Sequence, residues 1–185
     1  MLITLLRHAE IHANDKGRYI GHTDSPLSQF GEQDAITFAK YFVQYNQNNN
    51  FDYIYSSDLK RCKQSLKPFL SELNLAIEPV YSKLLREKFW GKHEGKNFDE
   101  ICKMENTEYI NFEQWINVLD GESIEEFIRR VKIVLEELKQ NDYKNILIMS
   151  HAGVIRTLIY LLSQLSFETS FYTSLPYASF VVLKI

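Results

Sequence analysis

The chain has 185 residues, of which 45% are hydrophobic and 24% are charged, and its formal net charge is −3 at pH 7. This composition is typical of a soluble globular protein, and the balance of charge gives no sign of a surface that binds nucleic acid or an anionic membrane. A site for a phosphate group would therefore have to come from a local concentration of arginine and histidine side chains.

The chain has two cysteines, Cys62 and Cys102, and they form no C-x-x-C pair. We therefore expect neither a disulfide framework nor a zinc cluster, and a reducing cytoplasm fits this usage. Arg7 and His8 interrupt the first apolar run almost at once, which does not fit a signal peptide. No apolar run approaches the ~18 residues that indicate a membrane-spanning helix. These features predict a cytoplasmic protein.

The first predicted element is a strand at residues 3–6, which read I-T-L-L and are followed by Arg7 and His8. A short apolar run of this kind is typical of a strand buried on both faces of a parallel sheet. Residues 146–149 read I-L-I-M and are followed by a serine and His151. Because open α/β sheets bind ligands at the carboxyl ends of their strands, we expect two imidazoles and an arginine to meet at one rim.

Between these two strands the chain begins with a polar, turn-rich segment at residues 10–26. A long irregular loop in a compact domain is more often functional than idle. Ser28 then predicts the N-cap of a helix, because apolar residues follow it at helical spacing.

Residues 51–56 predict a second strand, and Ser57 and Asp58 after it are typical N-cap residues for the next helix. The first turn of that helix carries Arg61. A guanidinium beside the free N–H groups of a helix start is well suited to bind phosphate. Pro68 lies inside the same helix, where it predicts a kink or an early end.

Residues 77–85 predict a third strand, and residues 98–115 have a weakly helical pattern that we expect to fold over the site. Ser123 and Glu126 form a capping box at the start of the clearest helix of the chain. The strand at 146–149 precedes the last two predicted elements, a helix from Gly153 to about residue 164 and a strand at 179–183.

Strands that alternate with helices predict an α/β fold, a three-layer sandwich with a mostly parallel central sheet and helices on both faces. We predict one domain over residues 1–185, in which residues 88–120 or so form a small lid-like excursion. The sequence contains no internal repeat.

Six blocks of sequence, in this order, resemble the histidine phosphatase superfamily, which also contains the cofactor-dependent phosphoglycerate mutases. The blocks are R-H-A-E-I-H-A-N at 7–14, G-H-T-D-S-P-L-S-Q-F-G at 21–31, S-S-D-L-K-R-C-K-Q-S at 56–65, L-R-E-K-F-W-G-K-H-E-G at 85–95, G-E-S at 121–123 and S-H-A-G-V-I-R at 150–156. An arginine followed by a histidine carries no information by itself, whereas six blocks in one order are specific. The resemblance implies the phosphoglycerate mutase-like fold.

The resemblance also implies roles for particular side chains. His8 would be the nucleophile that attacks phosphorus and forms a phosphohistidine. Arg7, Arg61 and His151 would surround the phosphoryl oxygens and balance their charge. Glu87 would donate a proton to the leaving alkoxide and then act as the base for the attacking water.

Further contacts to the substrate are expected from Asn14, from Ile20 and the backbone at Gly21, and from Ala152. The resemblance implies no metal and no cofactor, because guanidinium and imidazolium groups would balance the phosphoryl charge. The expected partner is a small phosphate ester. We expect no nucleic acid and no membrane as partners, and the sequence gives no prediction of the oligomeric state.

Three departures from the family pattern bear on the shape of the substrate. Ala9 and Ala152 stand where the family has a glycine after each histidine. Residues 89–93 read F-W-G-K-H, where the family has D-F-G-x-W, so an aspartate and a tryptophan of the pocket wall are replaced. None of these positions is a catalytic side chain.

The function predicted from the sequence is a phosphomonoesterase for a small organic phosphate, with α-ribazole 5'-phosphate in cobalamin biosynthesis as the best named substrate. The excursion at 88–120 is short, which favours hydrolysis over retransfer of the phosphoryl group. The alternatives are phosphoglycerate mutase or a fructose-2,6-bisphosphatase-like activity. A non-catalytic module that binds a phospho-ligand is an alternative of another class, which the presence of both His8 and Glu87 disfavours.

Overall fold

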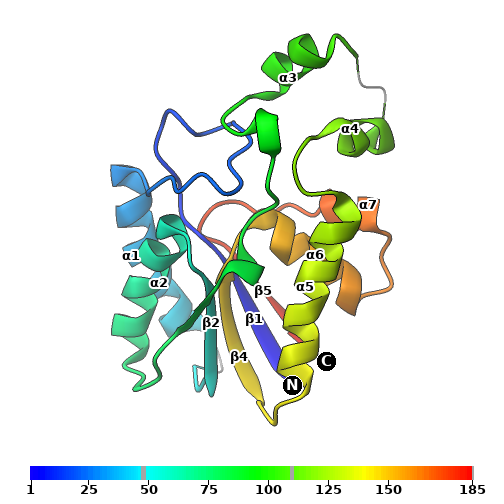
Figure 1. The fold of residues 1–185 in the computed structure, drawn as a ribbon. Helices are drawn as coiled ribbons and strands as arrows, with labels where there is room; N and C mark the ends of the chain where they lie inside the picture. Colours follow the sequence, from blue (N-terminus) through cyan, green and yellow to red (C-terminus); the bar gives the residue numbers. More distant parts are fainter. Residues whose placement is uncertain (47–48, 109–110, 185) are drawn as a thin grey trace.

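The computed structural model describes residues 1–46, 49–108 and 111–184. Within this part of the chain, the central sheet has five strands in the order β3-β2-β4-β1-β5. Their bounds are Leu2–Arg7 (β1), Tyr53–Ser57 (β2), Val80–Ser82 (β3), Asn145–Ser150 (β4) and Phe180–Lys184 (β5). All neighbouring strands pair in parallel except β5, which runs antiparallel to β1. The predicted α/β fold with a mostly parallel sheet is confirmed (Figure 1).

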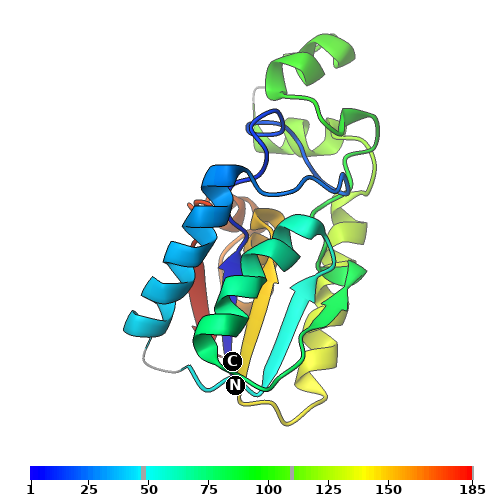
Figure 2. The same cartoon turned by 90° about the vertical axis from the view of Figure 1, so that its left-hand side faces the viewer.

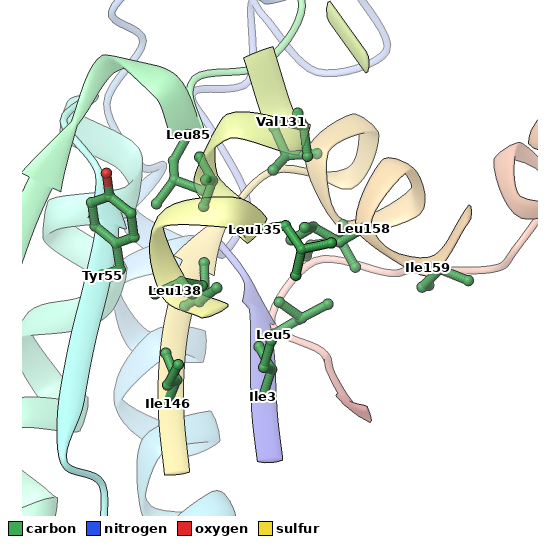
Figure 3. Packing of buried hydrophobic residues seen from close by; sticks show 14 of the residues in the cluster. Ile3, Leu5, Tyr55, Leu85, Val131, Leu135, Leu138, Ile146, Leu158 and Ile159 are labelled. Carbon is green, nitrogen blue, oxygen red and sulfur yellow. The ribbon is translucent and has the colours of Figure 1, made fainter. Parts of the chain in front are cut away.

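Helices cover both faces of this sheet (Figures 1 and 2). Helices α1 (Gln29–Tyr45) and α2 (Lys60–Leu73) cover one face, and α5 (Ile124–Lys139) and α6 (Ala152–Leu162) cover the other. The side chains of β1 divide between two apolar clusters accordingly. Ile3 and Leu5 pack under α5 and α6 (Figure 3), and Leu6 packs with the buried residues of α1 and α2. This division explains the continuous apolar run, because both faces of the strand are buried.

The ends of β1 and β4 lie side by side at one edge of the sheet. In their parallel register Arg7 stands opposite Ser150, so the two histidines that follow, His8 and His151, come together with their ring centroids 5.1 Å apart. The rim predicted from the two apolar runs is confirmed.

A lid covers this edge of the sheet at the top of Figure 1. It contains a short 3-10 helix at Gly91–His93 (η2) and two helices, α3 (Phe98–Glu105) and α4 (Phe112–Val118). Its apolar side chains cluster around Trp90, Ile101, Ile116 and Leu119. Helices α3 and α4 occupy the predicted excursion, whereas the single domain over residues 1–185, with its lid-like excursion at 88–120, stays a prediction.

His93 joins two parts of the lid from a fully buried position. Its Nδ1 lies 3.1 Å from the backbone N–H of Asp120, and its Nε2 lies 2.8 Å from the Glu105 carboxylate. Because Nδ1 accepts, the proton sits on Nε2 and is donated to Glu105. His93 therefore connects α3, through Glu105, to the segment before α5, through Asp120.

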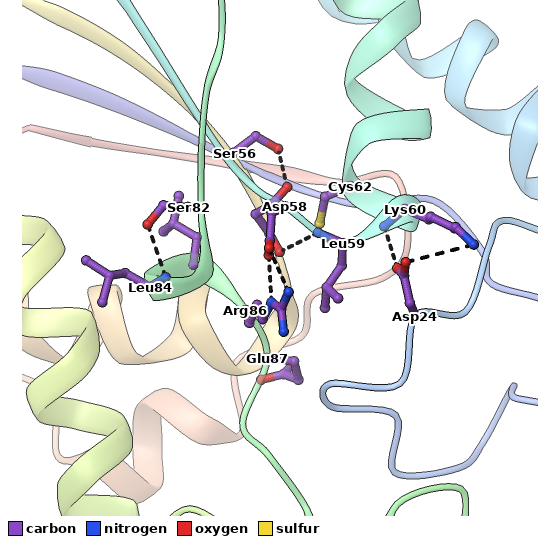
Figure 4. A network of polar contacts seen from close by, with 12 residues as sticks. Asp24, Ser56, Asp58, Leu59, Lys60, Cys62, Ser82, Leu84, Arg86 and Glu87 are labelled. Carbon is purple, nitrogen blue, oxygen red and sulfur yellow. Dashed lines mark hydrogen bonds and ion pairs between the residues drawn. The ribbon is translucent and has the colours of Figure 1, made fainter.

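The start of α2 differs from the prediction. Its N-cap is Leu59, which makes no side-chain capping bond. The carboxylate of Asp58 instead binds Arg86 through two contacts of 2.6 Å, and the first backbone N–H of the helix, from Lys60, is accepted by Asp24 at 2.7 Å (Figure 4). The prediction that Ser57 and Asp58 cap this helix was wrong, because an acidic residue of a remote loop supplies the cap.

Three smaller differences concern the ends of elements. Helix α2 continues past Pro68 to Leu73, because Leu66 and Phe69 on either side of the proline are held in the core. The third strand is only Val80–Ser82 and is followed by a 3-10 helix, Lys83–Leu85 (η1). A further helix, Phe167–Phe171 (α7), was not predicted.

In the described residues no helix is long and apolar enough to cross a membrane.

The packing of α1 against the sheet gives a test of the fold. Phe42 is 0% exposed and contacts the rings of Phe51, Phe69 and Phe180. We expect Phe42→Ala to lower the free energy of unfolding by about 3–5 kcal/mol, because the truncation leaves a cavity in a close-packed core. Phe30, on the same helix, is 66% exposed, so Phe30→Ala is the matched control and should change it by less than about 0.5 kcal/mol. Equal effects of the two variants, measured by denaturant titration, would contradict this packing.

Candidate active site

His8 follows the last residue of β1 and is 5% exposed. Its Nδ1 lies 2.7 Å from the carbonyl oxygen of Ala9, which can only accept, so Nδ1 carries the proton and Nε2 is left as the bare, nucleophilic nitrogen. Burial lowers the pKa of His8 well below its usual range, and the positive charges of Arg61 and Arg7 lower it further. The ring is therefore neutral at pH 7, as a nucleophile must be.

Arg61 lies in the first turn of α2 and is 1% exposed. Its guanidinium donates to the carbonyl oxygens of Thr23 at 2.9 Å and Gly21 at 2.7 Å, and its Nε donates to Nδ1 of His151 at 3.1 Å. Among the described residues it forms no ion pair with a carboxylate. A guanidinium has five N–H donors, so Arg61 retains donors and its full charge for an anionic ligand.

The loop that presents those carbonyl groups to Arg61 is held from its other side by Glu94. The Glu94 carboxylate accepts the backbone N–H groups of Gly21, His22 and Thr23, at 3.2, 2.9 and 3.3 Å. With its N–H groups bound to Glu94, the loop can turn its carbonyl groups toward Arg61. Glu94 thus positions Arg61 indirectly.

Arg7, the last residue of β1, is held by the C-terminal part of the chain. Its Nη1 donates to the carbonyl oxygen of Leu175, and its guanidinium carbon lies 4.1 Å from the centre of the Tyr177 ring. Its Nε is buried and has no hydrogen-bond partner. A buried donor without an acceptor costs free energy. The Arg7 side chain also lines a small cavity at this rim, where its charge is available to an anion.

His151 follows β4 and is 1% exposed. Its Nδ1 accepts from Arg61, so the proton lies on Nε2, which is 2.9 Å from the hydroxyl oxygen of Ser57. Burial and the charge of Arg61 lower the pKa of His151 well below its usual range. The sequence led us to expect an imidazolium that faces the phosphoryl group, whereas the structure has a neutral ring with both nitrogens bound to protein groups.

Glu87 follows η1 and is fixed by backbone donors. Its two carboxylate oxygens accept the N–H of Lys88 at 3.0 Å and the N–H of Gly153 at 3.0 Å. The preceding residue, Arg86, is held by its paired contacts with Asp58 (Figure 4). A methyl group at Gly153 would lie 2.2 Å from Glu87 Oε1, so the glycine of the S-H-A-G block leaves the space that this contact needs.

Two adjoining cavities lie at this rim. The first has a volume of about 140 Å³ and is lined by basic and imidazole groups, among them Arg7, His8 and Arg61. The second has a volume of about 230 Å³ and a largely aromatic wall that includes Trp115, Phe127 and Phe171. Both cavities are lined by the same three residues, Tyr19, Glu87 and Trp90. The carboxylate of Glu87 therefore stands between a cationic chamber and an aromatic one.

The structure brings together most of the residues predicted for the site. Arg7, His8, Ile20, Arg61 and Glu87 line the first cavity, His151 stands behind His8, and Ala152 lines the second cavity.

Two predicted binding residues have other surroundings. Asn14 is exposed in the loop after β1 and its backbone N–H faces His12. Gly21 directs its N–H to Glu94 and not to the cavity, and a methyl group there would lie 2.0 Å from the carbonyl oxygen of Lys88. The backbone donors expected at Gly21 are thus occupied, and this glycine serves close packing.

Sequence reasoning missed three groups that build the site. Tyr177 lines the first cavity and contacts both Arg7 and His8, yet it lies in no recognised block. Gly153 and Glu94 lie inside recognised blocks, but only their contacts with Glu87 and with the loop at 20–23 reveal what they do. In the described part of the chain, no group of three or more His, Cys, Asp or Glu side chains is arranged to hold a metal ion.

Comparison with known families gives a match over residues 3–185 to the model of the histidine phosphatase superfamily (branch 1). The chain belongs to this superfamily. Among curated proteins, this histidine phosphatase is 30% identical over 166 residues to the adenosylcobalamin/alpha-ribazole phosphatase of Escherichia coli, covering 86% of this chain and 77% of the relative. It is 27% identical over 169 residues to the metal-independent phosphoserine phosphatase of Arabidopsis thaliana, covering 89% of this chain and 69% of the relative.

Among solved structures, the phosphatase resembles the alpha-ribazole phosphatase of Shigella flexneri, with a TM-score of 0.82, 26% identity, and coverage of 100% of this chain and 91% of the other. The superfamily and the phosphatase relatives identify the chain as a phosphatase, a hydrolytic enzyme. They do not establish which substrate the enzyme hydrolyses, because relatives of similar identity have names that give different substrates.

The contact between Gly153 and Glu87 gives a test of the site. We expect Gly153→Ala to lower kcat by roughly 10- to 100-fold, because the added methyl displaces the carboxylate that transfers the proton, and such a group contributes at least about 10²-fold. Gly17 lies in an exposed loop with open space around its Cα and a φ of +76°. Gly17→Ala therefore strains the backbone without a contact to Glu87, and this control should lower stability but leave kcat of the folded enzyme unchanged. Full activity of Gly153→Ala would contradict the proposed position of Glu87.

The neutral state of His8 can be observed directly by NMR of the imidazole nitrogens. A histidine is neutral at any pH above its own pKa, and burial beside two guanidinium groups lowers the pKa of His8. We therefore expect its resonances to keep neutral positions as the pH falls through 6.5, the ordinary value, with His8→Gln used to assign them. A titration midpoint near 6.5 would contradict the lowered pKa, and a midpoint above 7 would show that the ring is charged at pH 7.

Proposed function

We propose that this phosphatase is a metal-independent phosphomonoesterase that acts through a phosphohistidine on a small organic phosphate. The observation that carries the proposal is the pairing of a neutral, buried His8, whose Nε2 is bare, with two guanidinium groups around one small cavity. A neutral nucleophile beside concentrated positive charge suits attack on a phosphate dianion, because the cations balance the charge that spreads over the phosphoryl oxygens.

The first half-reaction transfers the phosphoryl group to the enzyme. Arg7 and Arg61, which both line the first cavity, bind the non-bridging oxygens through guanidinium donors that no protein group in the described part of the chain uses. His8 Nε2 forms a bond to phosphorus while the bond from phosphorus to the ester oxygen breaks. Glu87, in its acid form, gives its proton to the departing oxygen, so the product leaves as a neutral alcohol.

The second half-reaction restores the enzyme. Glu87, now a carboxylate, takes a proton from a water molecule, and the water oxygen attacks phosphorus. The bond from phosphorus to His8 Nε2 breaks, and inorganic phosphate leaves. In this scheme His151 holds the guanidinium of Arg61 in place through Nδ1 and faces His8 edge-on.

The substrate is the least determined part of this function. α-Ribazole 5'-phosphate, the substrate suggested by the sequence, stays a candidate, and it is supported by relatives named as alpha-ribazole phosphatases. A serine phosphate is a second candidate, supported by a relative named as a metal-independent phosphoserine phosphatase. Mutase activity is a weaker alternative, because the lid between Glu87 and α5 contributes only η2, α3 and α4 in its described part.

Phosphate release in the presence of a chelator tests this function. The panel contains p-nitrophenyl phosphate, α-ribazole 5'-phosphate, fructose 2,6-bisphosphate, and 3-phosphoglycerate with 2,3-bisphosphoglycerate. We expect full activity in chelator, with at least one organic ester reaching a kcat/KM of about 10⁴ M⁻¹s⁻¹. An absolute requirement for a divalent metal, or transfer of phosphate between positions of phosphoglycerate without release, would overturn the proposal.

Replacement of the nucleophile separates catalysis from binding. We expect His8→Gln to lower kcat by at least roughly 10⁴-fold, because removal of a nucleophile abolishes the covalent route. The variant should still gain thermal stability when inorganic phosphate is added, since Arg7 and Arg61 are intact. His12→Gln, in the exposed loop after β1, is the matched control and should keep activity of the same order as the unaltered enzyme. Near-normal turnover by His8→Gln would exclude the phosphohistidine route.

A further inference from the structure

The second cavity adjoins the phosphate chamber at Glu87, where the leaving group of the substrate must stand to receive its proton. It is lined by residues of the lid and of the helices on one face of the sheet. Trp115 comes from α4, Phe127 from α5, Arg156 from α6 and Phe171 from α7. With a volume of about 230 Å³, it is smaller than the ~300–1,000 Å³ of typical ligand pockets. A compact leaving group fits this chamber.

Two cations line this otherwise aromatic cavity, Lys88 and Arg156. Lys88 is 2% exposed, and its ammonium lies 4.5 Å from the centre of the Trp90 ring. Among the described residues neither cation forms an ion pair with a carboxylate. Burial lowers the pKa of both groups, which reflects the cost of holding a charge away from water.

Some of the N–H donors of each cation bind backbone carbonyl groups, and the other donors have no such partner among the described residues. The Lys88 ammonium donates to the carbonyl oxygens of Phe89 at 3.3 Å and Asp120 at 3.2 Å, so one of its three N–H donors remains. The Arg156 guanidinium donates through Nε and Nη2 to the carbonyl oxygen of Thr173, at 3.1 Å each. These contacts fix both side chains in place without neutralising them.

The residues that line the two cavities carry more positive than negative charge in total. The basic residues that line them are Arg7, Arg18, Arg61, Lys88 and Arg156, and the acidic residue is Glu87. Arg18 is paired with Glu100 at 2.6 Å. A phosphate dianion balances Arg7 and Arg61, and Glu87 is uncharged while it holds the proton that it gives to the leaving group. Lys88 and Arg156 then have no counter-charge among the residues that line the two cavities.

We propose that the second cavity receives the leaving group and that Lys88 and Arg156 select phosphomonoesters whose leaving group carries a carboxylate. This inference rests on the proposed function. It points to a phosphorylated hydroxy acid or hydroxy amino acid of few carbons. It disfavours α-ribazole 5'-phosphate, because the leaving group of that ester carries no negative charge to balance these two cations.

Matched pairs of esters test the inference on the unaltered enzyme. O-phosphoserine and O-phosphoethanolamine differ only by the carboxylate, and 3-phosphoglycerate and glycerol 3-phosphate differ by a carboxylate in place of a hydroxymethyl group. We expect the carboxylated member of a pair to have a kcat/KM roughly 10- to 100-fold higher, the range expected for a hydrogen bond to a charged group. Equal rates within both pairs, or a preference for the uncharged members, would overturn the inference.

Substitutions then assign the preference to these two residues. In Lys88→Met or Arg156→Met the ratio of kcat/KM within a pair should fall toward one, and Lys88→Arg or Arg156→Lys should retain part of it. Lys132→Met and Arg129→Met, at exposed positions of α5, are the matched controls and should keep the ratio. A purely structural role for the two cations would lower both rates of a pair alike, and an unchanged ratio in both folded methionine variants would contradict the inference.

The outcomes distinguish this inference from the proposed function. If p-nitrophenyl phosphate and the members of a pair are all hydrolysed without a preference for the carboxylate, the inference fails and the phosphomonoesterase stands. If none of these esters, p-nitrophenyl phosphate included, releases phosphate, the proposed function fails and the inference fails with it. Should the methionine variants not fold, the preference of the unaltered enzyme still decides the inference.

Discussion

The site depends on one buried charge, the guanidinium of Arg61. Burial of a cation without a carboxylate partner is costly, and here the cost is met by hydrogen bonds to the backbone carbonyls at residues 21 and 23 and to His151. These bonds determine the position of the loop and the tautomer of His151, and the charge of Arg61 adds to the effect of burial in lowering the pKa of His8. The charge itself stays available, so the same arrangement that makes the apo site costly makes it a strong receptor for a phosphate dianion.

The surrounding structure is arranged to hold this charge and the groups beside it. Glu94 binds the N–H side of the loop whose carbonyl groups face Arg61, and Asp24 of the same loop caps the helix that carries Arg61. Two contacts fix Glu87. The backbone N–H of Gly153 donates to its carboxylate, and the preceding residue, Arg86, is held by Asp58. Arg61 and Glu87 are therefore positioned in part by residues that are remote in sequence.

Much of the fold and part of the site followed from the sequence. The two apolar runs predicted adjacent parallel strands, and the register of Arg7 with Ser150 brings their histidines together. The capping box at Ser123 predicted α5 correctly. The cap of α2 was not predictable, because its acceptor is Asp24, which lies in a loop that is remote from the helix start in sequence. Tyr177 and Lys88 were missed for a similar reason. Tyr177 lies in none of the six blocks, and Lys88 lies in the block at 85–95 at a position for which the resemblance implies no role, so only the tertiary structure places them at the cavities.

The central claim is that His8 attacks through Nε2 because Ala9 holds the proton on Nδ1. The most direct test is to quench the enzyme during turnover of a labelled phosphate ester and to locate the label by mass spectrometry and phosphorus NMR. The account predicts a phosphoryl group on His8 and on its Nε2 atom, with none in Arg61→Met, which loses the charge that stabilises transfer. A label on Nδ1, on another residue, or on no residue while turnover continues would contradict it.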